Sequence, residues 1–348
     1  MIRAIWLKIR IELSGLCSIL YIITIYLILY DDGMFTMLTF FELLAPVLFL
    51  GIVAASLSRI SGVALSMIIV PTLLVWGATP LDVVAFMLLF VVYNNFTAET
   101  QDVRLNYKEL VLFPGWKMAI PLILTVLITI VMPPAGIAFF MACFVLELMA
   151  TVYKRIPEKQ RPALHRVVVL SVLSAIVTSI GAYAGPRIPS EYYFGLVGIA
   201  ILAITAFAWY AGRHRNAFKG VWEFIWVDMN VLLGLFGVES SNYPAGLTRD
   251  YHSPMDRMLP MITVVGGYAG LMVVFGVYKM FSIPSFITAI GAALGMRMFG
   301  LYEFDRRGSF SYLAIGLAIA AVVCLYLVSP VPTGFDAVNA IMTQPINQ

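Results

Sequence analysis

An arginine and several serines interrupt an otherwise apolar stretch in the first part of the chain, and they are the residues whose chemistry stands out. Arg59 lies between Ser58 and Ser61, and Gly62 follows. A guanidinium inside such a stretch is costly unless it faces a protein-lined or water-filled cavity, so it usually marks a polar site or pathway. Its planar fork of N–H groups suits a two-pronged bond to an oxyanion. The alternative is a loop between two short helices, with Arg59 reaching toward lipid headgroups.

Two carboxylates and a group of neutral polar residues extend this candidate set. Glu239 ends an apolar run, where a buried carboxylate could carry a coupling proton, and Glu147 lies in the middle of another run. The plainer alternatives for Glu239 are an external loop or a structural salt bridge to Arg59. Serines beside glycine also serve close helix packing, and asparagines at helix ends are often solvated. The hydroxyls and amides that could line the same pathway are Ser240, Ser241, Asn94 and Asn95.

Composition identifies the class of protein. Hydrophobic residues make up 61% of the 348 residues and charged residues 12%, and the mean hydropathy of the sequence is +0.93. An integral membrane protein is therefore expected. The net charge of +3 is too small to indicate a nucleic-acid partner. The three cysteines and three histidines are not spaced as metal ligands, and no phosphate loop or catalytic triad is present, so we expect no metal, no cofactor and no enzyme.

The apolar runs predict an all-α integral membrane protein, a polytopic bundle of about 10–12 helices in two related halves. Some runs are shorter than a bilayer requires, so broken or re-entrant short helices are expected near residues 51–80 and 234–250. Within the first of these, the glycines and Pro71 are expected to break the helix. The predicted spans are 13–30, 41–57, 62–77, 83–97, 116–132, 135–153, 166–185, 194–212, 221–238, 257–279, 284–299 and 311–328.

The distribution of positive charge predicts topology and domain organisation. The most basic loops, 154–161 and 213–219, are expected on the cytoplasmic side, together with both chain termini. The protein is then a multi-pass component of the cell inner membrane. The predicted divisions are an extra N-terminal span at 1–40, a first membrane half at 41–153, a basic loop and extra hairpin at 154–220, a second half at 221–329 and a tail at 330–348.

Similar patterns of small residues occur in the two predicted halves. Leu48-Phe-Leu-Gly51 precedes the Arg59 segment, and Val231-Leu-Leu-Gly234-Leu-Phe-Gly237 precedes Glu239. Corresponding interruptions in two halves are typical of the binding sites of secondary transporters. The stretch from Gly51 to Pro80, with Ile290-Gly-Ala-Ala-Leu-Gly-Met-Arg297 in the second half, resembles the TauE/SafE sulfite exporter family. The resemblance covers roughly residues 41–153 and 221–328.

This resemblance implies a transporter of two four-helix halves that exports sulfite or another small organosulfur or organic anion across the inner membrane. The candidate coupling ion, a proton, follows instead from Glu239 and Glu147. The expected partners are the anionic substrate, membrane lipid, and either a second copy of the chain or a larger membrane complex. This sequence departs from the family pattern because charge appears at both glycine-rich breaks. The alternative is therefore a non-transporting membrane subunit or scaffold.

Overall fold

The computed structural model describes residues 37–61, 64–99, 115–213, 221–239, 255, 258–279, 283–299, 319–320 and 322–323. The chain divides into two compact units, Met1–Pro46 and Val47–Gln348. In the first unit, residues 37–46 are described and are helical; all packing discussed below lies within the second. The described helices are α2 (Met37–Ser61), α3 (Leu65–Val75), α4 (Pro80–Glu99), α6 (Gly115–Val131), α7 (Pro133–Arg155), α8 (Leu164–Ala184), α9 (Ser190–Arg213), α10 (Trp222–Phe236), α12 (Leu259–Gly276) and α13 (Ile283–Phe299).

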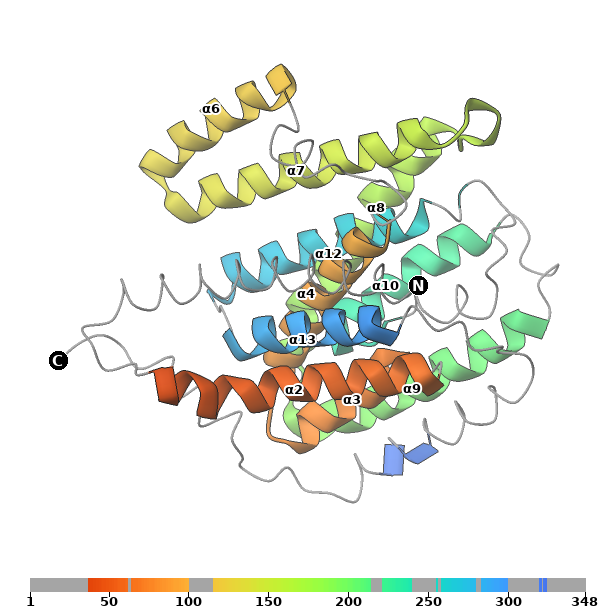
Figure 1. Cartoon of the computed structure of the whole chain (residues 1–348). Helices are drawn as coiled ribbons and strands as arrows, with labels where there is room; N and C mark the ends of the chain where they lie inside the picture. The colour runs from red at the N-terminus through yellow and green to blue at the C-terminus, as the bar shows by residue number, and fades with distance from the viewer. Residues whose placement is uncertain are drawn as a thin grey trace, which may run out of the picture. The chain divides into compact units, whose positions relative to one another are not determined.

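The all-α prediction is confirmed for the part of the chain that the structure describes, which contains helices and two short 3₁₀ turns but no strand (Figure 1). Each of these helices coincides with a predicted span to within about four residues. The first predicted span, 13–30, lies outside the described residues, and only four positions of the last, 311–328, are described. α8 with its following 3₁₀ turn, and α12, are each long and apolar enough to cross a membrane.

The predicted spans 41–57 and 62–77 place the helix break close to where the structure has it, but the expected contributions of Gly51 and Pro71 to that break are wrong. Gly51 lies inside α2, which continues through Arg59 to Ser61, and Pro71 lies inside α3. Proline removes a single backbone hydrogen bond, a loss that neighbouring packed helices can offset. The described chain leaves helical geometry between Ser61 and Leu65 instead. The expectation of a short helix holds, because the 11 residues of α3 would cover only about 16 Å of a hydrocarbon core roughly 30 Å thick.

α2 and α13 cross with their backbones in contact. A Cβ built on Gly51 would lie 2.3 Å from the carbonyl oxygen of Thr288, and one built on Gly291 would lie 2.3 Å from that of Leu48. Real Cβ atoms do not approach oxygen so closely, so these positions accept only glycine without a shift of the backbone. Small residues that let backbones approach are the usual means of packing helices in membranes.

α8 and α10 cross in the same way, and the equivalence holds residue by residue. A Cβ on Gly234 would lie 2.4 Å from the carbonyl oxygen of Thr178, and one on Gly181 would lie 2.4 Å from that of Val231. Gly234 thus takes the place of Gly51, and Gly181 the place of Gly291. A third contact repeats as well: Gly295 faces the carbonyl of Ile52, and Gly185 faces that of Leu235.

The sequences of α8 and α13 carry the same repeat. The segment Thr178–Arg187 and the segment Thr288–Arg297 share Thr-x-Ile-Gly-Ala-x-x-Gly-x-Arg. Superposing one set of contacts on the other places α2 on α10 and α13 on α8. If α4 is then placed on α12, the contact of α4 with α13 corresponds to the contact of α12 with α8. Both of these contacts are present. The sequence predicted a first half that ends at residue 153, whereas this packing groups α8 with the helices of the first half.

The two related sets of helices run in opposite directions. Along the crossing of α4 and α12, Gly267 faces Val92 and Gly270 faces Leu88, so the residue numbers rise in one helix as they fall in the other. Because α4 and α12 are equivalent but antiparallel, superposing one set of helices on the other reverses the direction of each helix. The second unit therefore contains an inverted structural repeat built from α2, α4 and α8 on one side and α10, α12 and α13 on the other.

Substitution of the crossing glycines tests this packing. Gly51→Ala and Gly234→Ala should each lower the free energy of unfolding by about 1–3 kcal/mol, since the new methyl group overlaps a backbone carbonyl. The matched control is Gly276→Ala at the end of α12, where an added Cβ meets no atom within 4 Å. Thermal unfolding of the purified protein in detergent measures the effect. Equal melting temperatures for all three variants would contradict the backbone contacts described above.

Candidate functional site

The N-terminus of α3 is buried inside the protein. Leu65 and Ser66 are fully buried in its first turn, and most of the helix packs into the main hydrophobic core. Ala64 occupies the N-cap position and offers no side-chain oxygen to the first-turn N–H groups. A helix N-terminus carries partial positive charge and unpaired N–H donors, which together favour an anion.

The hydroxyl of Ser66 is the second feature of this site. Its Oγ atom is buried and has no hydrogen-bond partner among the described residues. A buried hydroxyl without a partner is costly, so such a group in a native protein calls for an explanation. An anion at the first turn of α3 would accept a hydrogen bond from this hydroxyl as well as from the backbone N–H groups. The buried helix N-terminus and the unpartnered Ser66 hydroxyl therefore both favour an anion as the ligand of this site.

The predicted site residues of the first half precede this turn. Ser58 is buried near the end of α2 and makes interactions of its own. Arg59 and Ser61 belong to the last turn of α2, but their side chains lie outside the described residues, as does Gly62. Binding of an anion by Arg59, and its pairing with Glu239, therefore stay predictions. Arg59 precedes the first residue of α3, Leu65, by six positions in the sequence.

Glu239 is buried, with 1% of its surface exposed, and it has interaction partners within the protein. It follows Gly237, which ends α10 in the left-handed conformation with a φ of 67°. A Cβ on Gly237 would touch Met87 and Val83 of α4, so this chain reversal packs directly on α4. The alternative of an exposed external loop does not hold for Glu239. By the inverted repeat its counterpart is Ser56, one turn before Arg59, and Ser240 and Ser241 lie outside the described residues.

The paired asparagines lie in the C-terminal part of α4. Asn95 is 6% exposed, and its Nδ2 atom has no hydrogen-bond partner among the described residues, whereas Asn94 is half-buried and does have partners. Solvation at a helix end therefore does not account for Asn95. Its buried amide remains compatible with a polar pathway along α4.

The second proton-coupling candidate lies on a different helix. Glu147 is half-buried in α7, and its backbone carbonyl accepts a hydrogen bond from the Thr151 hydroxyl. Neither ion pair found among the described residues includes it. Within the same part of the chain, no group of three His, Cys, Asp or Glu side chains could hold a metal ion.

Among the buried polar residues that sequence reasoning did not single out, two lie at the helix starts discussed here. The first is Ser66, which resembles the other serines of an apolar run. The second is Asp82, which is fully buried at the start of α4 and accepts hydrogen bonds from the Thr79 hydroxyl at 2.6 Å and from the Thr79 N–H at 3.2 Å. The Asp82 N–H donates back to the Thr79 hydroxyl, and Ser285 of α13 donates to the Asp82 carbonyl. The sequence Thr79-Pro-Leu-Asp82 is a capping-box pattern with proline at N1, and that signal would have identified this reciprocal pair.

No known protein family, curated protein or solved structure matches this chain. The resemblance to the sulfite exporters therefore stays a prediction that rests on the residues quoted for it.

Two hydroxyls that differ in their contacts separate a structural role from a ligand-binding role. Thr79→Ala should lower the free energy of unfolding by about 1 kcal/mol, because it removes the cap of α4. Ser66→Ala should leave stability unchanged or slightly higher, because its hydroxyl has no partner to lose. Thermal unfolding of the ligand-free protein compares the two. If Ser66→Ala cost as much as Thr79→Ala, the Ser66 hydroxyl would be a structural group.

Proposed function

We propose that this chain is a secondary transporter of small anions in a membrane and that the buried N-terminus of α3 forms part of its binding site. The observation that carries the proposal is the inverted repeat, in which the same glycine contacts recur in helices of opposite direction. Inverted repeats are common in secondary transporters, where each half supplies broken helices to a central site and the two halves rock against each other.

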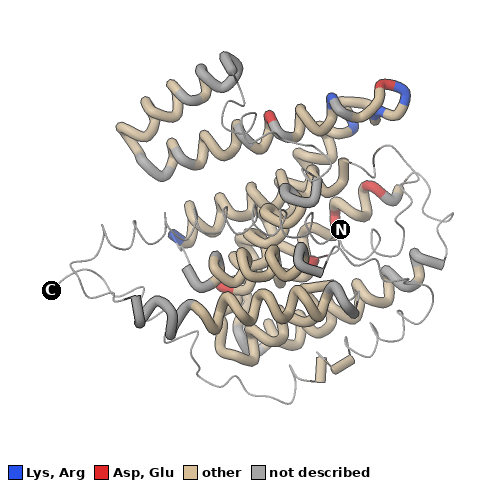
Figure 2. The backbone as a smooth tube through the Cα atoms, viewed as in Figure 1, with Lys and Arg blue, Asp and Glu red and all other residues tan. Residues whose placement is uncertain are grey.

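The outer surface supports a membrane location. Along α8, residues Val168, Val172, Ile176 and Ile180 recur every four positions, and each is about half exposed. α6 also carries a series of exposed aliphatic side chains. Figure 2 shows the densest group of described charged residues at the loop between α7 and α8, while few charges are coloured on the helix bodies. Soluble monomers rarely expose such continuous apolar faces, whereas lipid covers them without cost.

The proposed substrate class follows from the site and from the resemblance. A helix N-terminus with a neighbouring hydroxyl suits a compact oxyanion, and Arg59 would add a positive charge with forked geometry. Sulfite, a small sulfonate or a small carboxylate fits this chemistry. We propose export across the inner membrane with both chain termini in the cytoplasm, because the basic loops would then face the cytoplasm.

A second role accounts for the same exposed surfaces. The apolar faces of α6 and α8 would also suit a non-transporting subunit that packs in a larger membrane complex. The two roles differ in substrate flux: a purified transporter in vesicles moves its anion alone, whereas a scaffold does not.

Transport assays on variants near the α3 N-terminus test the proposed site. Arg59→Ala should abolish uptake of radiolabelled sulfite or sulfonate into inside-out vesicles, and Arg59→Lys should restore part of it, since a point charge lacks the fork. Ser66→Ala should lower the apparent affinity about tenfold to a hundredfold, which corresponds to the loss of one hydrogen bond to a charged group.

The matched control is Thr72→Ala, on the same helix, whose exposed hydroxyl bonds only to the Ile68 carbonyl. It should transport as the wild type does. Normal transport by both Arg59→Ala and Ser66→Ala would remove the α3 N-terminus from the pathway.

The role of the buried carboxylate is tested separately. If Glu239 carries the coupling proton, Glu239→Gln should still bind the anion but should lose the dependence of transport on an imposed pH gradient. Glu147→Gln should keep that dependence unless the proton travels through α7. A Glu239→Gln variant that still responds fully to the gradient would exclude Glu239 as the coupling group.

A further inference from the structure

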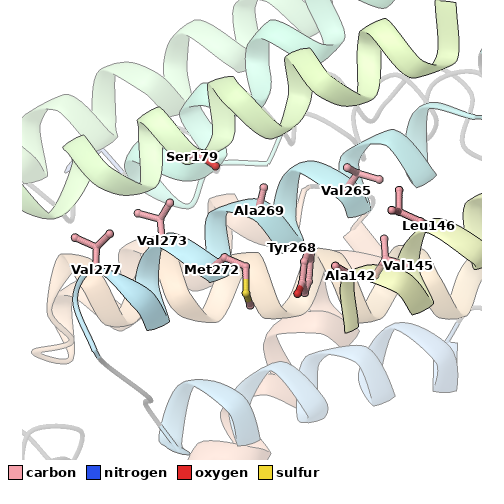
Figure 3. Close-up of a pocket in the computed structure, with 10 residues that line it drawn as sticks. All are labelled: Ala142, Val145, Leu146, Ser179, Val265, Tyr268, Ala269, Met272, Val273 and Val277. Atoms are coloured by element: carbon pink, nitrogen blue, oxygen red, sulfur yellow. The ribbon is translucent and has the colours of Figure 1, made fainter. Parts of the chain in front are cut away.

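An open groove of about 480 Å³ runs between α7, α8 and α12 (Figure 3). Its walls are almost entirely apolar, with Ala142 and Val145 from α7 and Ala269 and Val273 from α12 among them. A groove of this composition, open at the surface of a membrane protein, would hold a hydrocarbon chain better than a polar molecule.

The polar groups on the walls do not call for a polar ligand. The hydroxyl of Tyr268 donates a hydrogen bond to the backbone carbonyl of Ala138 in α7, so its polar end is already satisfied within the protein. Ser179 of α8 is the other polar residue on the walls. The body of the groove therefore has no free charge, and any charged part of a ligand must lie beyond its end.

A cation lies at one end of this groove. Ser179 and Val277 line the groove, and Tyr183 follows one turn after Ser179 while Tyr278 follows Val277 directly. The guanidinium of Arg187 stacks on the Tyr183 ring at 3.4 Å from its centroid and lies 5.4 Å from the centroid of Tyr278. Its Nη1 donates to the Tyr183 carbonyl at 2.9 Å. Two aromatic rings thus hold an arginine in place within about one helical turn of the groove.

Arg187 forms no ion pair with a described carboxylate, since the two ion pairs found among the described residues involve Arg161 and Arg166. Lys279, which follows Tyr278, is exposed and adds a second positive charge at this end. Tyrosine and basic residues at helix ends are typical of the interface between hydrocarbon and headgroups, and basic pockets between membrane helices bind anionic lipids.

We propose that this groove binds an anionic phospholipid, with one acyl chain between α7 and α12 and the headgroup phosphate on Arg187 and Lys279. The proposal rests on the membrane location given above but not on transport. The tyrosine stack would fix the guanidinium in place, and the continuous path from Val277 to Tyr278 joins the hydrocarbon part to the charged part.

Native mass spectrometry of delipidated protein tests the proposal directly. The protein is titrated with phosphatidylglycerol and, separately, with phosphatidylcholine of identical acyl chains. The wild type should bind phosphatidylglycerol more tightly by about fivefold per basic residue engaged. Arg187→Gln should remove most of this preference, and Arg187→Lys should retain part of it. The control Lys159→Gln, an exposed charge in the loop between α7 and α8, should change nothing.

Variants that fill the groove test the acyl chain. Ala269→Trp from α12 should weaken binding of both lipids by at least tenfold, and Ala142→Phe from α7 should do the same from the opposite wall. Two variants on different helices guard against one that fails to fold, and thermal unfolding checks each. Since lipid binding is measured without substrate, it can fail while anion transport stands, or stand while transport fails.

Three results would overturn the proposal. The first is equal binding of both lipids by the wild type and Arg187→Gln. The second is displacement of bound lipid by an excess of glycerol phosphate, which would show that the headgroup anion alone is recognised. The third is a dimer mass that disappears in Ala269→Trp, which would make the groove an interface between copies of the chain.

Discussion

Contact between backbones at two glycine crossings is the constraint on which the rest of this fold depends. In the proposed membrane location, helices gain little from burying apolar side chains, because the surrounding lipid tails are just as apolar, so close approach and dispersion contacts must hold them together. At Gly51 and Gly234 the approach is closer than any side chain would allow. Because the same three contacts recur at both crossings, they fix how α2 lies on α13 and how α10 lies on α8, and α4 and α12 pack between these pairs.

The close crossing of α2 has a consequence for the chain that follows it. Ser58 is already buried, and α3 begins within the hydrophobic core rather than at a surface where water could satisfy its first N–H groups. α4 begins directly after an exposed residue, Thr79, and its first turn is nevertheless capped by the reciprocal Thr79–Asp82 pair. α3 begins at an alanine and places an unpartnered serine in its first turn. The start of α3 is therefore buried and uncapped, whereas α4, which begins beyond the other end of α3, is capped at a part-exposed start. Of the two, the start of α3 is the better candidate for a ligand.

Sequence reasoning located the helices well because apolar runs of membrane length have few alternatives to helix. It failed where the role of a residue depends on how closely two helix backbones approach each other. Gly51 was expected to break a helix, yet it lies within one, since a missing side chain serves contact between helices as readily as it serves a turn. The repeat between Thr178–Arg187 and Thr288–Arg297 becomes recognisable only from the contacts of its glycines, because small residues are common in apolar helices. Arg59 was found by its charge, whereas Ser66 was not, since only burial without a partner distinguishes it.

The inverted repeat gives both halves one scaffold but not one chemistry. The first break follows a cation, Arg59, and leads into the uncapped α3, whereas the second holds a buried carboxylate, Glu239, at the position equivalent to Ser56. If both breaks bound an anion, a cation like Arg59 would be expected in each of them. If both breaks were only structural, neither would be expected to carry a charge. In the proposed transporter, one half would recognise the anion and the other would respond to the proton. Rocking of equivalent helices could then couple two unlike events across a single centre.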